Sequence, residues 1–309
     1  MSSTNSLPIA KHLYQHFTMD SSRWNFFVPR SDDIVVASTY KAGTTWAQLI
    51  VAYLIFGGKK LPAPIFEISP WIDHRIFPLE LILTNLDRQT HRRVVKTHLA
   101  LDGLPFHQNL KYVYVGRDPR DIFMSFWNFY GNFTPEWIGL HNAIPGRVGP
   151  ELPPCPNDIH ELWRNWMTRA WFPWENDGYP FGSVLHHAQS WWDYRQLPNI
   201  LFVHYADLRN DLEGGIRRIA RFLGIDPPAD AWPTIVRNCT FAEMKAHGDE
   251  LAPGIDISLK GGSNTFFYKG TNGRWRDVLS ADELKLYTVA TDREMTPECR
   301  RWHENGGPT

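Results

Sequence analysis

Short runs of consecutive apolar residues, each turning polar at its end, recur along this chain of 309 residues. Strands buried on both faces of a parallel sheet have this pattern, whereas strands exposed on one face alternate between apolar and polar positions. We therefore predict four buried strands, over residues 34–39, 92–98, 111–117 and 200–208.

Between these runs, apolar residues recur with the period of an α-helix. One such pattern runs from Trp46 to Leu54 and stops at Gly57 and Gly58, and another stops at Gly224, as helices commonly do. Strands that alternate with helices form right-handed βαβ units. The sequence therefore predicts an α/β fold of three layers, in which a doubly wound, mostly parallel, P-loop-like sheet has helices on both faces.

Two segments show no such period. Residues 131–160 contain six prolines and residues 253–275 are rich in glycine, so we expect an irregular excursion in the first and a loop in the second. No internal repeat or change of composition marks a domain boundary. We therefore predict one domain over residues 1–309, with elaborated loops.

Composition narrows the class of protein. The formal net charge of −1 gives no overall attraction to nucleic acid or to an anionic membrane, so any anion must bind locally. Three widely spaced cysteines without a CxxC pair argue against a disulfide framework or a zinc site. The N-terminus has no signal-peptide pattern, and no apolar run is long enough to span a bilayer. We expect a soluble cytoplasmic protein without a membrane or nucleic-acid partner.

Polar residues stand at or just after the end of each predicted strand: Lys41, the segment 96–98, Arg117 and Tyr205. The carboxyl ends of parallel strands meet at one edge of the sheet, where doubly wound sheets bind their ligands. The sequence therefore predicts a site assembled from four separate segments.

The first of these segments, STYKAGTTW (residues 38–46), indicates a strand end, a turn and a helix start. Helix N-termini attract anions, Gly43 lets the backbone approach closely, and Thr44 and Thr45 add hydroxyls. Lys41 precedes Gly43, whereas the lysine of the G-x-x-x-x-G-K-[ST] loop follows the last glycine. The alternative is an ordinary turn capped by a threonine.

Two further segments have two interpretations each. Arg117 and Ser125, eight residues apart, could grip a second phosphate, or Arg117 could be a surface arginine paired with Asp121. His98 could be a general base beside Lys96, although a lone histidine at a strand end is more often structural. By itself, the Lys-Gly pair at 269–270 is a weak indication of a loop that closes over a phosphate.

Taken together, STYKAGTTW, VVKTH, YVYVGRDPRDIFMSF, FVHYADL, CTFAEM and YKGTNGRW resemble the motifs of the cytosolic-type sulfotransferase family, in the family's order and at compatible spacing. The resemblance runs from about Asp33 to Trp275. It implies an enzyme that transfers the sulfuryl group of 3′-phosphoadenosine 5′-phosphosulfate (PAPS) to a hydroxyl group, with an amine as the alternative acceptor. The second product is 3′,5′-adenosine diphosphate (PAP).

The resemblance also implies roles for individual residues. His98 corresponds to the catalytic base, with Lys41 and Lys96 as cations near the transferred group. The positions that correspond to cofactor contacts are Lys41, Ala42, Gly43, Thr44 and Thr45 at the 5′-phosphosulfate, Trp46, Tyr205, Cys239, Thr240 and Phe241 around the adenine, and Arg117, Ser125, Tyr268, Lys269 and Gly270 at the 3′-phosphate.

The chain departs from the family's motifs in several places. Tyr40 and Ala42 replace the usual proline and serine of the loop, Cys239 replaces a hydroxyl residue, and Tyr268 replaces an arginine, which removes one charge from the 3′-phosphate site. The family's C-terminal dimer motif is not recognisable, so the oligomeric state stays open.

The chemistry suits these residues. Sulfuryl transfer resembles phosphoryl transfer in its loose transition state, so positioning and charge do most of the work. A neutral His98 can take the acceptor's proton, while Lys41 and Lys96 stabilise the leaving group. We expect no metal.

The acceptor is expected to be small and aromatic or hydrophobic, because most of the 14 tryptophans lie between residues 127 and 192. Excursion 131–160 could act as its lid. The candidate wall residues are Phe66, Phe123, Phe126, Trp127, Phe129, Tyr130, Phe133, Trp137, Trp163 and Trp166.

Two alternatives compete with this hypothesis. A P-loop-type nucleotide kinase or NTPase would need the G-K-[ST] order that is missing here. A non-catalytic nucleotide-binding relative would lack the base, whereas His98 is present.

Overall fold

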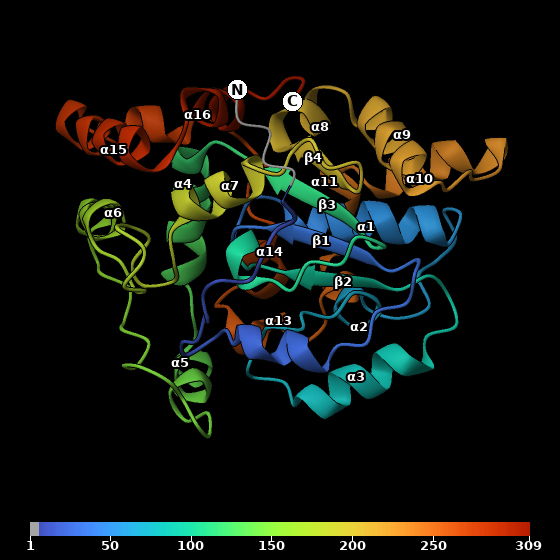
Figure 1. Cartoon of the computed structure of the whole chain (residues 1–309), viewed down its shortest axis with the longest axis horizontal. Helices are drawn as coiled ribbons and strands as arrows, with labels where there is room; N and C mark the ends of the chain where they lie inside the picture. Colours follow the sequence, from blue (N-terminus) through green and yellow to red (C-terminus); the bar gives the residue numbers. More distant parts are fainter. Residues whose placement is uncertain (1–5) are drawn as a thin grey trace.

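A four-stranded sheet lies at the centre of the computed structural model, which describes residues 6–309 (Figure 1). The strands are β1 (Ile34–Ser38), β2 (Val94–Thr97), β3 (Lys111–Gly116) and β4 (Ile200–His204). Every neighbouring pair is parallel, in the order β2-β1-β3-β4. The four apolar runs of the sequence are therefore the four strands of this sheet.

The fourth strand is shorter than predicted, because a helix begins at Tyr205 directly after it. His204 caps this helix, since its ring accepts a hydrogen bond from the Ala206 amide at 3.2 Å. Tyr205 is consequently the first residue of helix α8 rather than part of the strand.

Helices cover both faces of the sheet, and alternate strand residues serve the two faces. Ile34 and Val36 pack in one buried cluster with Leu49, whereas Val35 and Ala37 pack in the other. On the first face lie α1 (Thr44–Ile55), α2 (Ile65–Ile68), α8 (Tyr205–Asn210), α9 (Leu212–Leu223), α10 (Trp232–Asn238), α11 (Phe241–Ala246) and α12 (Gly248–Leu251).

The second cluster takes in residues from α3 (Leu79–Arg88), α4 (Pro119–Tyr130), α6 (Ile159–Thr168), α7 (Val184–Trp192), α15 (Ala281–Glu294) and α16 (Pro297–Asn305). The short 3₁₀ turns are η1 (Ser21–Phe26), η2 (Leu101–Gly103), η3 (Ala229–Ala231) and η4 (Arg274–Asp277). Within residues 6–309, no helix combines the length and the apolar character needed to cross a membrane.

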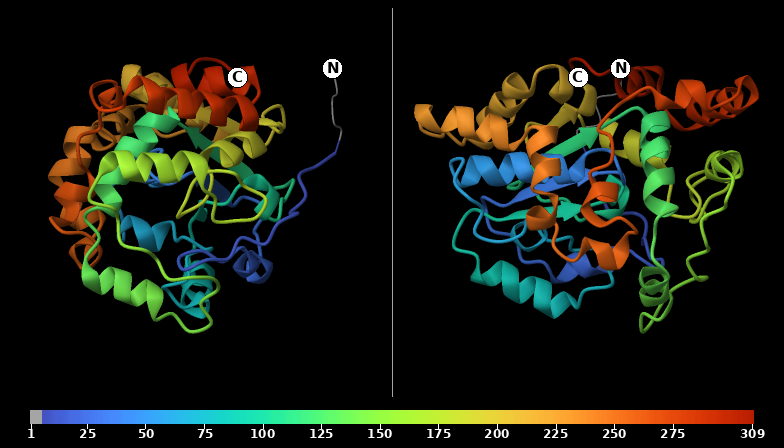
Figure 2. Two further views of the ribbon diagram at one scale, coloured as in Figure 1. Left: turned by 90° about the vertical axis from the view of Figure 1, so that its left-hand side faces the viewer. Right: turned by 180° about the vertical axis from the view of Figure 1, so that it is seen from behind.

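The two segments expected to be irregular contain short helices and contact each other. The first holds α5 (Pro135–Asn142), which Thr134 caps by accepting a hydrogen bond from the Trp137 amide at 3.1 Å. The second holds α13 (Ile255–Ser258) and α14 (Gly262–Phe266), and the orange α14 lies beside the green α4 (Figure 2). The Lys260 amide donates to the Asn132 carbonyl at 2.8 Å, so the two segments form one connected wall.

A buried ion pair fixes the amino ends of two neighbouring strands. Arg93 and Asp33, which precede β2 and β1, are 2% and 0% exposed and form two hydrogen bonds of 2.8 and 2.5 Å. Such a bidentate pair satisfies both charges. It lies at the end of the sheet opposite the predicted site.

Candidate functional site

The loop between β1 and α1 has the geometry of an open anion site. Lys41 and Gly43 both have left-handed backbone angles, with φ of 64° and 115°. A side chain at Gly43 would place its Cβ 2.9 Å from the Tyr205 ring, so only glycine allows this approach. Among the side chains of residues 6–309, none caps α1. This contradicts the alternative of an ordinary threonine-capped turn and leaves the first amides of the helix for a ligand.

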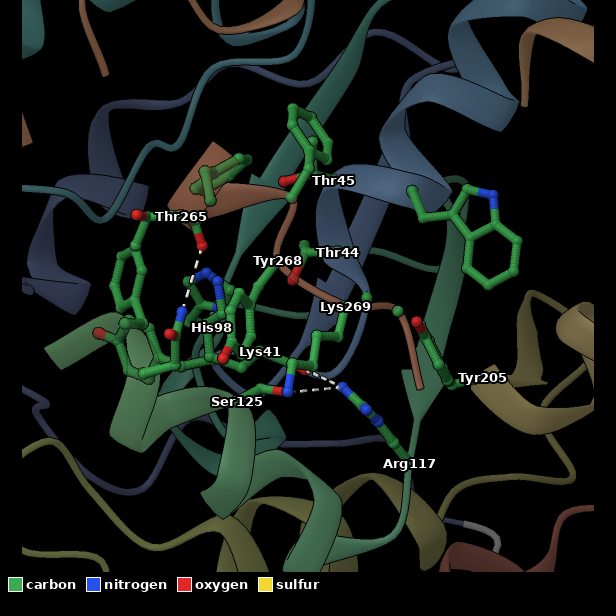
Figure 3. Close-up of a pocket in the computed structure, with 18 of the residues that line it drawn as sticks. Lys41, Thr44, Thr45, His98, Arg117, Ser125, Tyr205, Thr265, Tyr268 and Lys269 are labelled. Atoms are coloured by element: carbon green, nitrogen blue, oxygen red, sulfur yellow. Dashed lines mark hydrogen bonds between the residues drawn. The ribbon is translucent and has the colours of Figure 1, made fainter. Parts of the chain in front are cut away.

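Arg117 follows β3 and ties the loop to the glycine-rich segment. Its guanidinium donates to the Lys41 carbonyl and to Ser125 Oγ, both at 3.1 Å (Figure 3). It also donates to the Thr271 carbonyl and the Asn272 side chain, both at 3.0 Å. The arginine is only 4% exposed.

The alternative of a surface arginine paired with Asp121 is therefore wrong. The Asp121 carboxylate instead accepts a hydrogen bond from the Gly273 amide at 2.6 Å. Ser125 lies on α4, whose start Asp118 caps by accepting from the Arg120 amide.

His98 is oriented by a backbone carbonyl. Its Nδ1 lies 2.7 Å from the Ser38 oxygen, which can only accept, so Nδ1 carries the proton and Nε2 is a free acceptor. Burial, with Lys96 nearby, lowers the pKa of His98 well below its usual range. The ring is therefore neutral, as a general base must be before it takes a proton.

Two lysines with weakened basicity lie around this base. Burial lowers the pKa of Lys41 to about 7, helped by the charges of Lys96 and Arg117. Burial likewise lowers the pKa of Lys96 to about 8, although Asp73 opposes the shift. The Lys41 ammonium lies 4.2 Å from the ring centre of Phe129.

These segments line one open cavity. Among the described residues that line it, six are Lys or Arg and none is Asp or Glu. The positive site is thus local, in a chain whose formal net charge is −1. The basic residues are Lys41, Lys96, Arg117, Arg209, Lys269 and Arg274.

Most of the predicted site residues line this cavity. They are Lys41, Gly43, Thr44, Thr45, Trp46, Lys96, His98, Arg117, Ser125, Tyr205, Phe241, Tyr268, Lys269 and Gly270.

Three predicted residues do not line the cavity. Ala42 is fully buried in the loop, Cys239 is fully buried in the core, and Thr240 caps α11 by accepting from the Glu243 amide. Cys239 still acts on the site through its backbone, because its carbonyl accepts from the Trp46 indole at 2.7 Å. This explains how a thiol can replace the family's hydroxyl there.

Sequence reasoning missed one of the most informative cations, Arg274. Its Nη2 lies 3.4 Å from Ser125 Oγ, the same atom that Arg117 contacts, and its guanidinium lies 5.4 Å from the Tyr268 ring centre. The signal was present in YKGTNGRW, five residues after the lysine of that motif.

The acceptor side of the cavity differs from the predicted wall. Only Phe129, Phe133 and Trp137 of the candidate rings line it. Rings such as Phe123 and Trp163 are completely buried in the core. The cavity is instead completed by residues that the sequence analysis did not select: Thr18, Tyr40, Trp71, His74, Asn128, His141, Phe181, Met244, Thr265, Phe266 and Phe267.

Comparison with known proteins accounts for this arrangement. The family model described as "Sulfotransferase domain" matches residues 31–297. The chain belongs to the sulfotransferase family. It is similar to a glycolipid sulfotransferase of Mycobacterium bovis, with 32% identity over 95% of this chain and 94% of the relative. Sulfotransferase 1A1 of Rattus norvegicus is 26% identical over 87% of each chain.

Solved structures agree on the fold. A mouse sulfotransferase, SULT7A1, complexed with PAP, superposes with a TM-score of 0.67 at 22% identity over 91% of each chain. The predicted fold class and enzyme class, a sulfotransferase that uses PAPS, are confirmed. The comparisons do not favour the kinase or NTPase alternative or the non-catalytic relative.

Proposed function

We propose that this sulfotransferase binds PAPS across the basic side of the cavity and transfers its sulfuryl group to a hydroxyl held against His98. One observation carries the proposal: a histidine with a free Nε2, two weakly basic lysines and an uncapped helix start line one cavity. These are the groups that in-line transfer between a hydroxyl and a phosphosulfate requires.

The 5′-phosphosulfate would lie at the start of α1, on the backbone of the loop and the hydroxyls of Thr44 and Thr45. Lys41 and Lys96 would stabilise the charge that develops on the oxygen linking sulfur to the departing phosphate. Their depressed pKa values support this assignment, because binding the anion restores full protonation of both lysines.

The 3′-phosphate would lie where Arg117 and Arg274 converge on Ser125. The family's arginine at the position of Tyr268 is absent from this chain, and Arg274 supplies a guanidinium beside that tyrosine ring. We infer that Arg274 replaces the missing charge. Lys269 and Gly270 complete this side, since the Gly270 backbone packs so closely on Phe241 that a Cβ would lie 2.8 Å from its ring.

Adenine would stack against Trp46 and Phe241. The bond from the Trp46 indole to the Cys239 carbonyl fixes one ring, and Tyr205 packs edge-on against Trp46 with ring centres 5.2 Å apart. Stacking of this kind contributes roughly 1–3 kcal/mol per base.

In the reaction, His98 Nε2 would take the proton of the acceptor hydroxyl as its oxygen bonds to sulfur. The bond from Nδ1 to Ser38 would stabilise the imidazolium that forms. Aromatic rings around this point, including Tyr40 at 4.4 Å and Trp71 at 4.8 Å from the His98 ring centre, favour a flat or hydrophobic acceptor.

Turnover of PAPS with a panel of acceptors tests the proposal. The panel comprises phenols, steroids, aliphatic alcohols, amines and, because of the mycobacterial relative's name, glycolipids. We expect sulfation of at least one hydroxyl class, together with thermal stabilisation by PAP. Stabilisation by Mg-ATP and not by PAP would contradict the assignment.

Some sequence-based expectations remain proposals. We infer one domain over the whole chain, supported by the continuous sheet and the family match over residues 31–297. Cytoplasmic location and the role of excursion 131–160 as a lid stay predictions.

A further inference from the structure

The acceptor side of the cavity continues past Trp71 to a second set of polar groups. The Trp71 ring centre lies 4.8 Å from that of His98 and 4.3 Å from that of His74, on which it stacks. His141 lies beyond, with its ring centre 6.1 Å from that of His74. One indole therefore separates the catalytic histidine from this distal end.

Three polar side chains meet at the distal end of the cavity. Thr18, His74 and His141 line the cavity and are 3%, 4% and 1% exposed. Within residues 6–309, the buried Thr18 hydroxyl forms no hydrogen bond. Nδ1 of His141 is paired with a backbone carbonyl, and the His74 ring stacks on Trp71 at the cavity wall. Buried polar atoms are normally paired, and leaving one unpaired costs about 1–3 kcal/mol.

A neighbouring histidine shows what a purely structural ring looks like here. His16 Nδ1 accepts from the amides of Thr18 and Met19 at 3.0 and 3.3 Å, and Nε2 lies 3.2 Å from the Phe181 carbonyl. Both of its nitrogens are used, whereas the His74 ring stacks on Trp71 at the cavity wall.

The tautomer of His141 determines which ligand group fits. Nδ1 lies 2.8 Å from the Trp137 carbonyl, which can only accept, so Nδ1 carries the proton and Nε2 is an acceptor. A ligand group that bonds to Nε2 of His141 must therefore donate a hydrogen bond, which a ketone or an ether cannot do. Burial lowers the pKa of His141 to about 4 and that of His74 well below its usual range, so both rings are neutral.

We propose that Thr18, His74 and His141 form a distal subsite for a second hydroxyl group, and that the preferred acceptor is an uncharged, rigid diol. The proposal rests on the proposed function, because the first hydroxyl is the one held at His98. An ammonium group would fit poorly at the distal end, since Arg75 and Arg23 lie nearby and no carboxylate lines the described cavity.

Matched acceptors test this subsite. Rigid aromatic diols of one, two and three rings are each compared with their monomethyl ethers, which keep the reacting hydroxyl and lose only the distal donor. The measured quantity is the ratio of kcat/KM for diol to ether. We expect about a 10-fold preference for at least one diol, and a ratio near one in Thr18→Val and His141→Phe.

His91→Phe is the matched control. The Nδ1 of His91 also binds a carbonyl, that of Arg92 at 2.9 Å, but the ring does not line the cavity, so the ratio should stay at its wild-type value. A ratio near one for every diol with the wild-type enzyme would overturn the proposal, as would a preference that survives both subsite variants. Failure of PAP to stabilise the enzyme would instead overturn the proposed function.

Discussion

Lys41 should make the affinity for PAP fall as pH rises above neutrality. In the free enzyme its pKa is lowered to about 7, first by burial and then by Lys96 and Arg117. A bound 5′-phosphate raises this pKa, because an adjacent anion favours the ammonium form. Above pH 7 the bound enzyme therefore holds more protons than the free enzyme, and binding weakens as protons become scarce.

The structure sets the size of the effect. At pH 9, two units above the free pKa, protonating Lys41 costs about 2.7 kcal/mol, at 1.36 kcal/mol per unit. The affinity for PAP at pH 9 should therefore be on the order of 100-fold weaker than its value below pH 7, provided that the pKa of Lys41 in the complex stays above 9. Lys96, with its pKa lowered to about 8, adds a smaller decline in the same direction.

Titration calorimetry from pH 7 to 9 measures this linkage, because the phosphate groups of PAP are already ionised in that range. Repeating it in buffers of different ionisation enthalpy counts the protons taken up. Lys41→Arg is the control, since arginine stays protonated throughout. The variant should take up about one proton fewer at pH 9. A wild-type Kd that does not change with pH would refute the reasoning.

Three further predictions address the base, the 3′-phosphate site and the fold. His98→Ala should bind PAP normally in calorimetry yet lose about 10²–10⁴-fold in turnover; retained turnover would exclude it as the base. Arg274→Ala should weaken PAP binding by about 10-fold or more, as expected for the loss of a charged hydrogen bond. Arg276 lies in the same segment but does not line the cavity, so Arg276→Ala should leave PAP binding unchanged. Equal effects of the two substitutions would contradict the assignment. Arg93→Ala leaves the Asp33 carboxylate buried without its partner. It should therefore lower the free energy of unfolding, measured in urea, by about 3–5 kcal/mol. A loss below about 1 kcal/mol would show that the pair contributes little.

Much of the sheet was predictable because its strands are buried on both faces. Continuous apolar residues then coincide with the strands, as in Ile34–Ser38, and the polar residue that follows each one marks the ligand edge. The end of the fourth strand was not predictable, since Tyr205 suits a strand as well as a helix. The His204 side chain caps a helix that begins at Tyr205, and this ends the strand at His204.

The cofactor residues were largely visible in motifs, whereas the acceptor wall was not. Trp163 and Phe123 are aromatic, as a wall of the acceptor site requires, but the packing of their helices places both side chains in the buried core. Trp71 and His74 come from a segment with no regular period, and Thr18 comes from a stretch without a motif. Only tertiary contacts bring these three positions to the cavity.

The bond from His98 to Ser38 also bears on how such an enzyme can change over evolution. Ser38 is the last residue of β1, so the base and the anion loop are anchored to the same strand. The acceptor wall is largely carried by connecting segments, such as those that hold Thr18, Trp71 and Phe133. Substitutions in those segments can therefore alter which molecule is accepted without disturbing the alignment of base and donor, so new specificities can arise while the chemical step is inherited intact.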